Sequence, residues 1–189
     1  GDTFGSYSLQ TGTTAAGFVF MSTQCRRAGG NNAFAVNSTF PYLNIAKVQL
    51  FQLGTAAQDF QVVFGINGQT SVVNTTQTIG YHWYYNGSAN SFWDNRSQNT
   101  AGTVSTVASP LAASINFVIL GVYKPGGSNI RDAVYFYSTD GVTYQVSSKF
   151  VGTASTYGGN LTFGIASTVG TTAKEFRLDY YGAAFNLAR

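Results

Sequence analysis

Charged side chains are scarce in this sequence. Lysine and arginine number 10 and aspartate and glutamate 7, so only 9% of the 189 residues carry a charge, whereas an intracellular soluble domain has about a quarter. Hydrogen bonding at the surface must therefore come from Ser, Thr, Asn, Gln and Gly, and aromatic residues make up a further 15% of the chain. This composition is typical of a β-protein that works outside a cell.

Cysteine is almost absent as well. Cys25 is alone, which excludes an internal disulfide. A secreted animal domain of this length more often carries a cysteine framework, so a virus, a phage or a bacterium is the favoured source. No apolar run approaches the ~20 residues that a membrane helix needs, and we expect no membrane insertion. The length suits one domain spanning residues 1–189.

Clustered positive charge is also missing. The formal net charge is +3, yet only Arg26 and Arg27 are adjacent and the other basic residues are dispersed. A nucleic-acid surface needs a stripe of Lys and Arg, because its affinity comes from neutralising several phosphates together. We therefore expect no nucleic-acid partner.

Apolar residues recur at every second position, which is the spacing of β-strands rather than helices. The run Glu175–Tyr180 should place Phe176, Leu178 and Tyr180 on one inner face. In the run 47–51 the alternation is broken at Phe51, which predicts a bulge there.

Turn signals separate these runs. Asp140-Gly141 lies between Ala133–Ser138 and Val142–Val146 and predicts a β-hairpin. The stretch Ile115–Tyr123 is apolar on both faces and suits a central strand. About ten to twelve short strands are expected, which predicts an all-β, antiparallel two-sheet sandwich.

The second half of the chain resembles a known fold family. The strand Ile115–Tyr123 is followed by Arg131–Tyr144, which contains a Val-x-Phe-Tyr-x-x-Asp-Gly pattern, and Phe176–Gly182 is similar to a closing strand. These features resemble the concanavalin A-like, laminin-G-like jelly rolls that occur in virus spike heads and phage tail-fibre tips. The resemblance implies a jelly-roll sandwich and a homotrimer as one possible assembly. The Glu-x-Asp-x-x-Glu strand of the family's catalytic members is absent.

The densest unusual stretch runs from Tyr81 to Asn99 and holds both tryptophans and the only histidine. Period-two spacing places Tyr81, Trp83 and Tyr85 on one face and His82 on the other, and Trp83 is expected in the core. Sugar rings stack on aromatic side chains while their hydroxyls bond amide, carboxylate and guanidinium groups. We therefore predict a glycan-binding site, with Trp93 on a loop, formed by Trp93, Asp94, Asn95, Arg96, Tyr84, Tyr85 and Asn86.

Catalytic and metal chemistry have few candidate residues. Glycoside hydrolysis commonly uses two carboxylates, and among the seven present only Asp94 and Asp132 have a suitable context. A Cys25–His82 pair is an alternative, although a lone cysteine is more often a small buried apolar residue. One Cys and one His cannot form a zinc site. We expect no enzyme activity, no metal and no cofactor.

Together these observations predict a non-enzymatic viral or phage surface protein, the head of a fibre or spike. It would be extracellular, on the virion surface beside other virion proteins, and would bind a host-surface glycan or another receptor. Two alternatives stay open. The chain could be a structural minor capsid or decoration protein, or a carbohydrate-binding module of a secreted bacterial protein.

Overall fold

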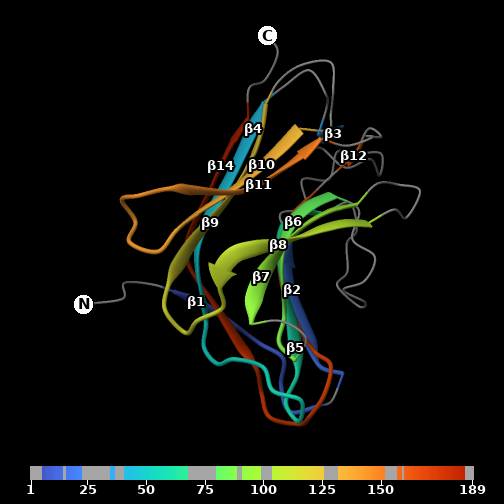
Figure 1. The fold of residues 1–189 in the computed structure, drawn as a ribbon. Helices are drawn as coiled ribbons and strands as arrows, with labels where there is room; N and C mark the ends of the chain where they lie inside the picture. The colour runs from blue at the N-terminus through green and yellow to red at the C-terminus, as the bar shows by residue number, and fades with distance from the viewer. Residues whose placement is uncertain are drawn as a thin grey trace.

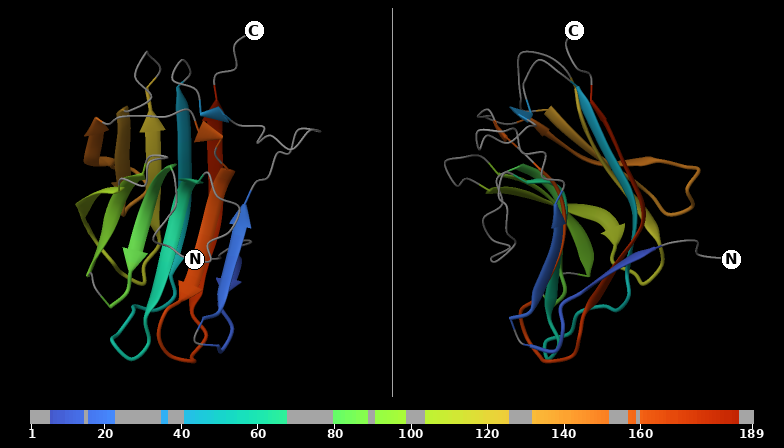
Figure 2. Two further views of the ribbon diagram at one scale, coloured as in Figure 1. Left: turned by 90° about the vertical axis from the view of Figure 1, so that its right-hand side faces the viewer. Right: turned by 180° about the vertical axis from the view of Figure 1, so that it is seen from behind.

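The chain folds into two β-sheets packed face to face (Figure 1). The computed structural model describes residues 6–14, 16–22, 35–36, 41–67, 80–88, 91–98, 104–125, 132–151, 157–158 and 160–185. None of these residues lies in a helix. Both sheets are curved, as the two views of Figure 2 show.

One sheet, called sheet A here, has six antiparallel strands. Their order across the sheet is β1 (Tyr7–Gln10), β14 (Glu175–Phe185), β4 (Tyr42–Leu50), β9 (Val118–Lys124), β10 (Asp132–Ser138) and β11 (Gln145–Val151). The strand β9 therefore lies between β4 and β10, which confirms a central strand, although it begins three residues later than Ile115.

The other sheet, sheet B, also has six antiparallel strands. Their order is β2 (Phe18–Ser22), β13 (Asn160–Ser167), β5 (Phe60–Asn67), β6 (Gly80–Asn86), β7 (Phe92–Gln98) and β8 (Val104–Ala112). Two short strands, β3 (Ala35–Val36) and β12 (Tyr157–Gly158), form a separate pair. The predicted all-β, two-sheet antiparallel sandwich is confirmed.

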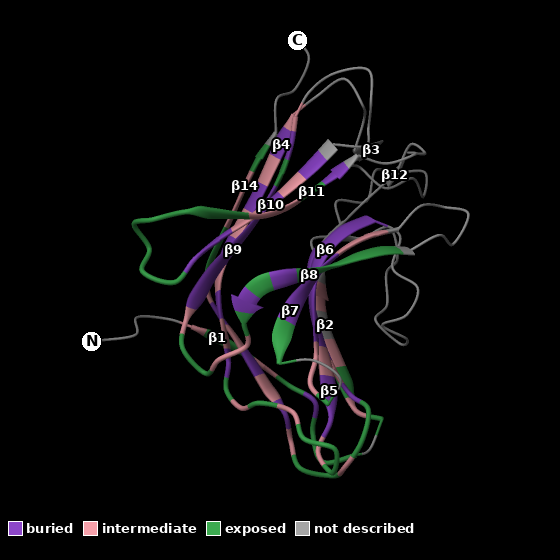
Figure 3. Cartoon of the chain, in the orientation of Figure 1, coloured by how far each residue is buried: buried purple, intermediate pink, exposed green. Residues whose placement is uncertain are grey.

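The core lies between the sheets and follows the period-two pattern. Along β4 buried and half-buried residues alternate strictly, and Ala46, Val48 and Leu50 are the apolar members of the inner row. Figure 3 shows buried residues along the middle of both sheets. Because successive side chains of a strand point to opposite faces, this alternation assigns the inner face of β4.

Trp83 sits at the centre of this core and is fully buried. Its indole Nε1–H donates to the carbonyl of Gly121 in the opposite sheet at 3.0 Å. Its ring meets the edge of Tyr135 with centroids 5.8 Å apart. The prediction that Trp83 is a core residue, with Tyr81 and Tyr85 on the same face, is confirmed.

The predicted hairpin at Asp140-Gly141 is also confirmed, since β10 pairs with β11 in antiparallel register. Gly141 has φ of 78°, a left-handed conformation that only glycine adopts without steric cost. The returning strand begins at Gln145 rather than Val142. The connection projects away from the outer face of sheet A, in orange in Figure 1.

A β-bulge lies in β14 and not at Phe51. The register pairs Leu178 with Val48 and Tyr180 with Lys47, so Asp179 is an extra residue. The expectation that Tyr180 continues the inner row of β14 is therefore wrong. The bulge turns Tyr180 to the outer face, where it is 44% exposed.

The next residue along the strand confirms the new phase of β14. Tyr181 takes the inner position, and its ring contacts that of Phe163 with centroids 5.3 Å apart. Phe51 follows the end of β4 as an exposed residue in a bend, so the bulge predicted there is wrong. Phe51 and Tyr180 are both aromatic, so the alternation of apolar and polar residues in the sequence does not show which of them lies next to a bulge.

Several expectations fall outside the described residues, among them those for Cys25 and the pair Arg26-Arg27. Within the described ranges, there is no helix both long and apolar enough to cross a membrane.

Candidate functional site

The predicted glycan-binding residues lie on β6 and β7, where they divide between the two faces of sheet B. Trp93 was expected on a loop, but it lies in β7 and points into the core, 1% exposed. Its ring packs against that of Tyr85, with centroids 5.7 Å apart. Tyr85 in turn accepts a hydrogen bond at its hydroxyl from the backbone amide of Gly54 at 2.9 Å. Both rings are core residues in this structure.

Asn95 also points inward and has no exposed surface. Its Oδ1 accepts hydrogen bonds from the hydroxyls of Ser147 and Ser148 on β11, at 2.6 and 2.7 Å. Asn95 therefore ties sheet B to sheet A.

The alternate residues Tyr84, Asp94 and Arg96 point to the outer face of sheet B. The Arg96 guanidinium lies over the Tyr84 ring, 3.3 Å from its centroid. Tyr84 and Asp94 are nevertheless buried, at 1% and 5% exposure. Burial, followed by the charge of Arg96, lowers the pKa of the neighbouring His82 to about 3, so the imidazole stays neutral.

Other predicted candidates do not form a charged cluster. Asn86 ends β6 and is half-buried. Asp132 begins β10, opposite Val151 of β11. Among the described residues no group of three or more His, Cys, Asp or Glu side chains could hold a metal ion.

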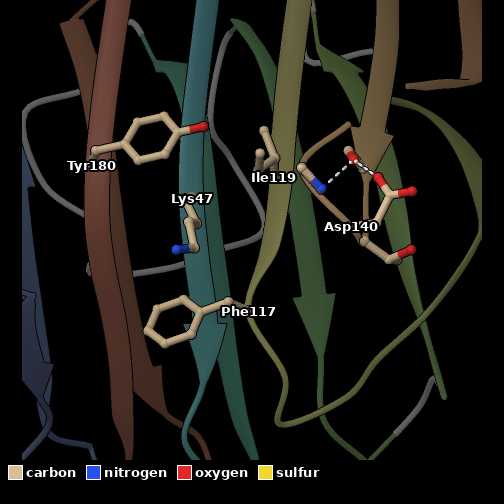
Figure 4. A pocket seen from close by; sticks show the side chains of 8 residues that line it. Lys47, Phe117, Ile119, Asp140 and Tyr180 are labelled. Atoms are coloured by element: carbon tan, nitrogen blue, oxygen red, sulfur yellow. Dashed lines mark hydrogen bonds between the residues drawn. The ribbon is translucent and has the colours of Figure 1, made fainter. Parts of the chain in front are cut away.

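A pocket of about 380 Å³ lies on the outer face of sheet A, and we call it the outer pocket. Figure 4 shows Tyr180 and Phe117 on one side, Asp140 on the other and Ile119 between them. Four strands, the β10–β11 hairpin turn and the residue before β9 supply its walls. It is lined by Lys47, Phe117, Ile119, Ser138, Thr139, Asp140, Gly141 and Tyr180.

The bulge in β14 builds one wall of this pocket. By inserting Asp179, it brings both Asp179 and Tyr180 beside Lys47 of β4. The Lys47 ammonium is 2.6 Å from a carboxylate oxygen of Asp179 and 5.0 Å from the centroid of the Phe117 ring. Re-aiming a side chain toward a surface site is a recognised consequence of a bulge.

Asp140 forms the opposite wall at the tip of the hairpin. Its Oδ1 accepts hydrogen bonds from the Ser138 hydroxyl at 2.9 Å and from the amides of Val142 and Thr143 at 2.8 and 2.7 Å. Bonds to the ionised carboxylate, the Thr143 amide first, lower the pKa of Asp140 to about 2. Asp140 is therefore a fixed, ionised acceptor at the surface.

Tyr180 offers the complementary group. Partial burial, and then the nearby Tyr144 hydroxyl, raises the pKa of Tyr180, so its hydroxyl keeps its proton. The outer pocket thus combines exposed ring surface, a protonated hydroxyl and an ionised acceptor around an apolar floor. Such a concave site, with few fixed polar groups, suits a small polar molecule that also has an apolar face.

Sequence reasoning missed this pocket. Asp140 was expected to form the hairpin turn, and Tyr180 was placed on the same face of its strand as Phe176 and Leu178. The Asp140-Gly141 turn was the one usable signal, because it places a carboxylate at an exposed hairpin tip.

No family model and no curated protein matches the sequence. Solved structures do match the fold. The alginate lyase AlgAT5 from polysaccharide lyase family 7 has a TM-score of 0.61 at 8% identity, covering 96% of this chain and 78% of that chain. The VIP36 exoplasmic/lumenal domain, in its Ca²⁺/Man3GlcNAc-bound form, has a TM-score of 0.59 at 6% identity, covering 97% and 85%.

A legume lectin-like domain from Entamoeba histolytica is also similar, with a TM-score of 0.55 at 6% identity, covering 95% of this chain and 89% of that chain. These identities are low, and what the structures share with this chain is the arrangement of two antiparallel sheets. The chain has the concanavalin A-like, legume-lectin-like jelly-roll fold.

Proposed function

We propose that this protein is a non-catalytic carbohydrate-binding domain and that it holds a saccharide in the outer pocket. The observation that carries the proposal is the outward turn of Tyr180, which exposes a ring opposite the ionised acceptor Asp140 across the apolar side chain of Ile119. A sugar offers a patch of C–H groups to the ring and hydroxyls to the carboxylate.

Similar folds support this class of ligand. The VIP36 domain is in a form bound to the glycan Man3GlcNAc, and the Entamoeba domain is legume lectin-like. A fold alone hosts many functions, so the proposal rests on the pocket and takes only general support from these neighbours.

The proposed setting is the extracellular surface of a virus or phage, as the head of a fibre or spike that attaches to a host glycan. A single shallow pocket binds a sugar weakly, and display of several copies raises the avidity. A homotrimer would supply such copies. The capsid-decoration alternative predicts that the isolated protein binds no glycan, and the bacterial-module alternative predicts binding to a polysaccharide.

The proposal of a non-catalytic role is supported by the state of the two carboxylates at the outer pocket, Asp140 and Asp179. Hydrolysis of a glycosidic bond needs a protonated acid near neutral pH. Asp140 has a pKa of about 2 and stays ionised, while Asp179 is paired with Lys47. Because the alginate lyase shares the fold, alginate is the substrate to test. We expect no rise in ultraviolet absorbance from unsaturated uronate ends, and a steady rise would contradict a non-catalytic role.

The binding test is a glycan array probed with a multivalent form of the protein and of its Tyr180→Ala variant. We expect selective binding that this substitution reduces at least tenfold, since it removes the ring wall. Tyr123→Ala is the matched control, because Tyr123 is 40% exposed on the same outer face but does not line the pocket. Equal loss in both variants would contradict the pocket as the site.

The β6–β7 residues remain a second proposed site, since Arg96 and Tyr84 together form a stacked cation and ring. Trp93→Ala is a poor probe of it, because loss of a buried tryptophan costs about 3–5 kcal/mol of stability. Arg96→Ala is the better variant on the same array. Binding that survives Tyr180→Ala and is lost in a folded Arg96→Ala protein would move the site to β6–β7.

A further inference from the structure

We infer that the outer pocket selects an uncharged pyranose over an acidic one, and that Asp140 is the residue that determines this specificity. The inference rests on the proposed function, since it names the class of saccharide that the same pocket takes. Three features of the pocket carry it: its charges, the orientation of Asp140 and the apolar floor.

The Lys47 ammonium is the only positively charged group among the residues that line the pocket. It is already paired with Asp179 at 2.6 Å and lies over the Phe117 ring. This ion pair neutralises the positive charge that would be needed to bind the carboxylate of an acidic sugar. To bind an acidic sugar, Lys47 would have to leave both partners, and no other lining residue offers a cation.

Asp140 then leaves the pocket with one uncompensated negative charge. The hydrogen bonds from Ser138 and from the two backbone amides all end on Oδ1, and the Thr143 side chain also donates to this carboxylate, so its orientation is fixed. We assign Oδ2 as the acceptor of sugar hydroxyls. A carboxylate that accepts bonds from hydroxyls attracts a neutral sugar and repels a uronate or sialate placed at the same distance.

The remaining contacts also favour a neutral ring. The floor is Ile119, which is 6% exposed, and the opposite wall is the exposed face of Tyr180. Moving an ionised group onto apolar surface without a partner costs much more than moving a C–H face or a bonded hydroxyl. The Tyr180 hydroxyl keeps its proton and can still donate to a sugar oxygen. The charge, the hydrogen-bonding groups and the apolar surface of the pocket therefore all favour an uncharged sugar ring.

The test compares sugars that differ only at C6, where a hydroxymethyl group is replaced by a carboxylate. The probes are multivalent conjugates of glucose and glucuronate, galactose and galacturonate, and mannose and mannuronate, assayed by biolayer interferometry. We expect one or more neutral members to bind and their uronates to bind about tenfold more weakly at low salt. Raising NaCl from about 0.05 to 0.5 M should narrow that gap by screening the repulsion.

Asp140→Asn tests the assigned residue, because it keeps the size of the side chain and removes its charge. We expect neutral binding to fall about tenfold and the preference over the uronate to drop below about threefold. Glu175→Gln is the matched control, because it removes the same charge from β14 at a residue that pairs with Arg177 outside the pocket. Thermal unfolding of each variant checks its fold.

The possible results are distinguishable. Binding of no saccharide, neutral or acidic, overturns the proposed function. Binding of a uronate as tight as that of its neutral partner overturns the neutral specificity and leaves carbohydrate binding intact. A preference unchanged in folded Asp140→Asn overturns the role of Asp140. If that variant does not fold, the salt dependence of the native protein decides, since a gap insensitive to salt contradicts charge repulsion.

Discussion

The outer faces of the two sheets both carry tyrosines, but their environments differ. On sheet A, Tyr123 and Tyr180 are 40% and 44% exposed, and Tyr180 lines a pocket. On sheet B, Tyr84 is 1% exposed under the guanidinium of Arg96 and beside buried Val63. The same residue type therefore provides exposed ring surface on one sheet and buried packing on the other.

The titratable groups on the two sides also differ in how far they are buried. Asp140 on the sheet A side is at the surface and its pKa is lowered by hydrogen bonds. His82 on the sheet B side is buried, and its pKa is lowered first by desolvation. A group held ionised at the surface can interact with a ligand, whereas a group held neutral by burial mainly affects stability. This difference supports the proposal that the outer pocket of sheet A is the binding site, whereas the buried groups on the outer face of sheet B contribute to packing.

The largest expected effect is a difference in the free energy of unfolding between alanine variants of Tyr84 and Tyr180. Tyr84→Ala should lower the free energy of unfolding by about 2–4 kcal/mol, because it removes a buried ring and the stacking partner of Arg96. Tyr180→Ala should cost less than about 1 kcal/mol, because its ring is half-exposed. Urea unfolding of both variants measures the difference. Equal losses would mean that the two faces do not differ in packing.

A pH effect of comparable size is expected from His82. Its folded pKa is about 3 and its ordinary value is 6.5, so below pH 6.5 the unfolded chain binds the proton first. Stability should be complete above pH 6.5 and fall by about 1.4 kcal/mol for each unit as the pH drops toward 3. Urea unfolding from pH 7 to pH 4 measures this slope, with His82→Gln as the control. A slope of the same size in His82→Gln would assign the pH dependence to other groups.

The smallest effect on stability should come from the ion pair beside the outer pocket. Asp179→Asn should change the free energy of unfolding by less than about 0.5 kcal/mol, because both partners are partly exposed. It should also release Lys47 toward the pocket and improve binding of the uronate conjugates relative to the neutral ones. An unchanged ratio of uronate to neutral binding would contradict the view that Asp179 neutralises Lys47.

Much of the fold could be predicted from local patterns. Period-two spacing assigned Trp83 to the core, and the Asp140-Gly141 turn predicted the β10–β11 hairpin. Both depend on interactions within a few residues, namely the alternation of side chains along a strand and the freedom of glycine to adopt positive φ. The central position of β9 followed in the same way from its two apolar faces.

The candidate site could not be predicted in this way. The extra residue at Asp179 is visible only in the pairing of β14 with β4, and it reverses the direction of Tyr180. Trp93 was expected to be accessible to a ligand, but its side chain points into the core between the two sheets, where the ring is buried. Composition cannot distinguish an exposed aromatic residue from a buried one when both lie among polar neighbours.

The sequence by itself determined that the chain is all-β, that the β10–β11 hairpin turns at Asp140-Gly141, and which face of β6 packs inward. These features depend on near neighbours and on the alternation of side chains along a strand. Only the tertiary structure decided where the outer pocket forms. The outer pocket brings together Lys47, Ile119, Asp140 and Tyr180, which are far apart along the chain. Strand register, including the one-residue bulge, is set by pairing between distant segments, and it decides which side chains face solvent.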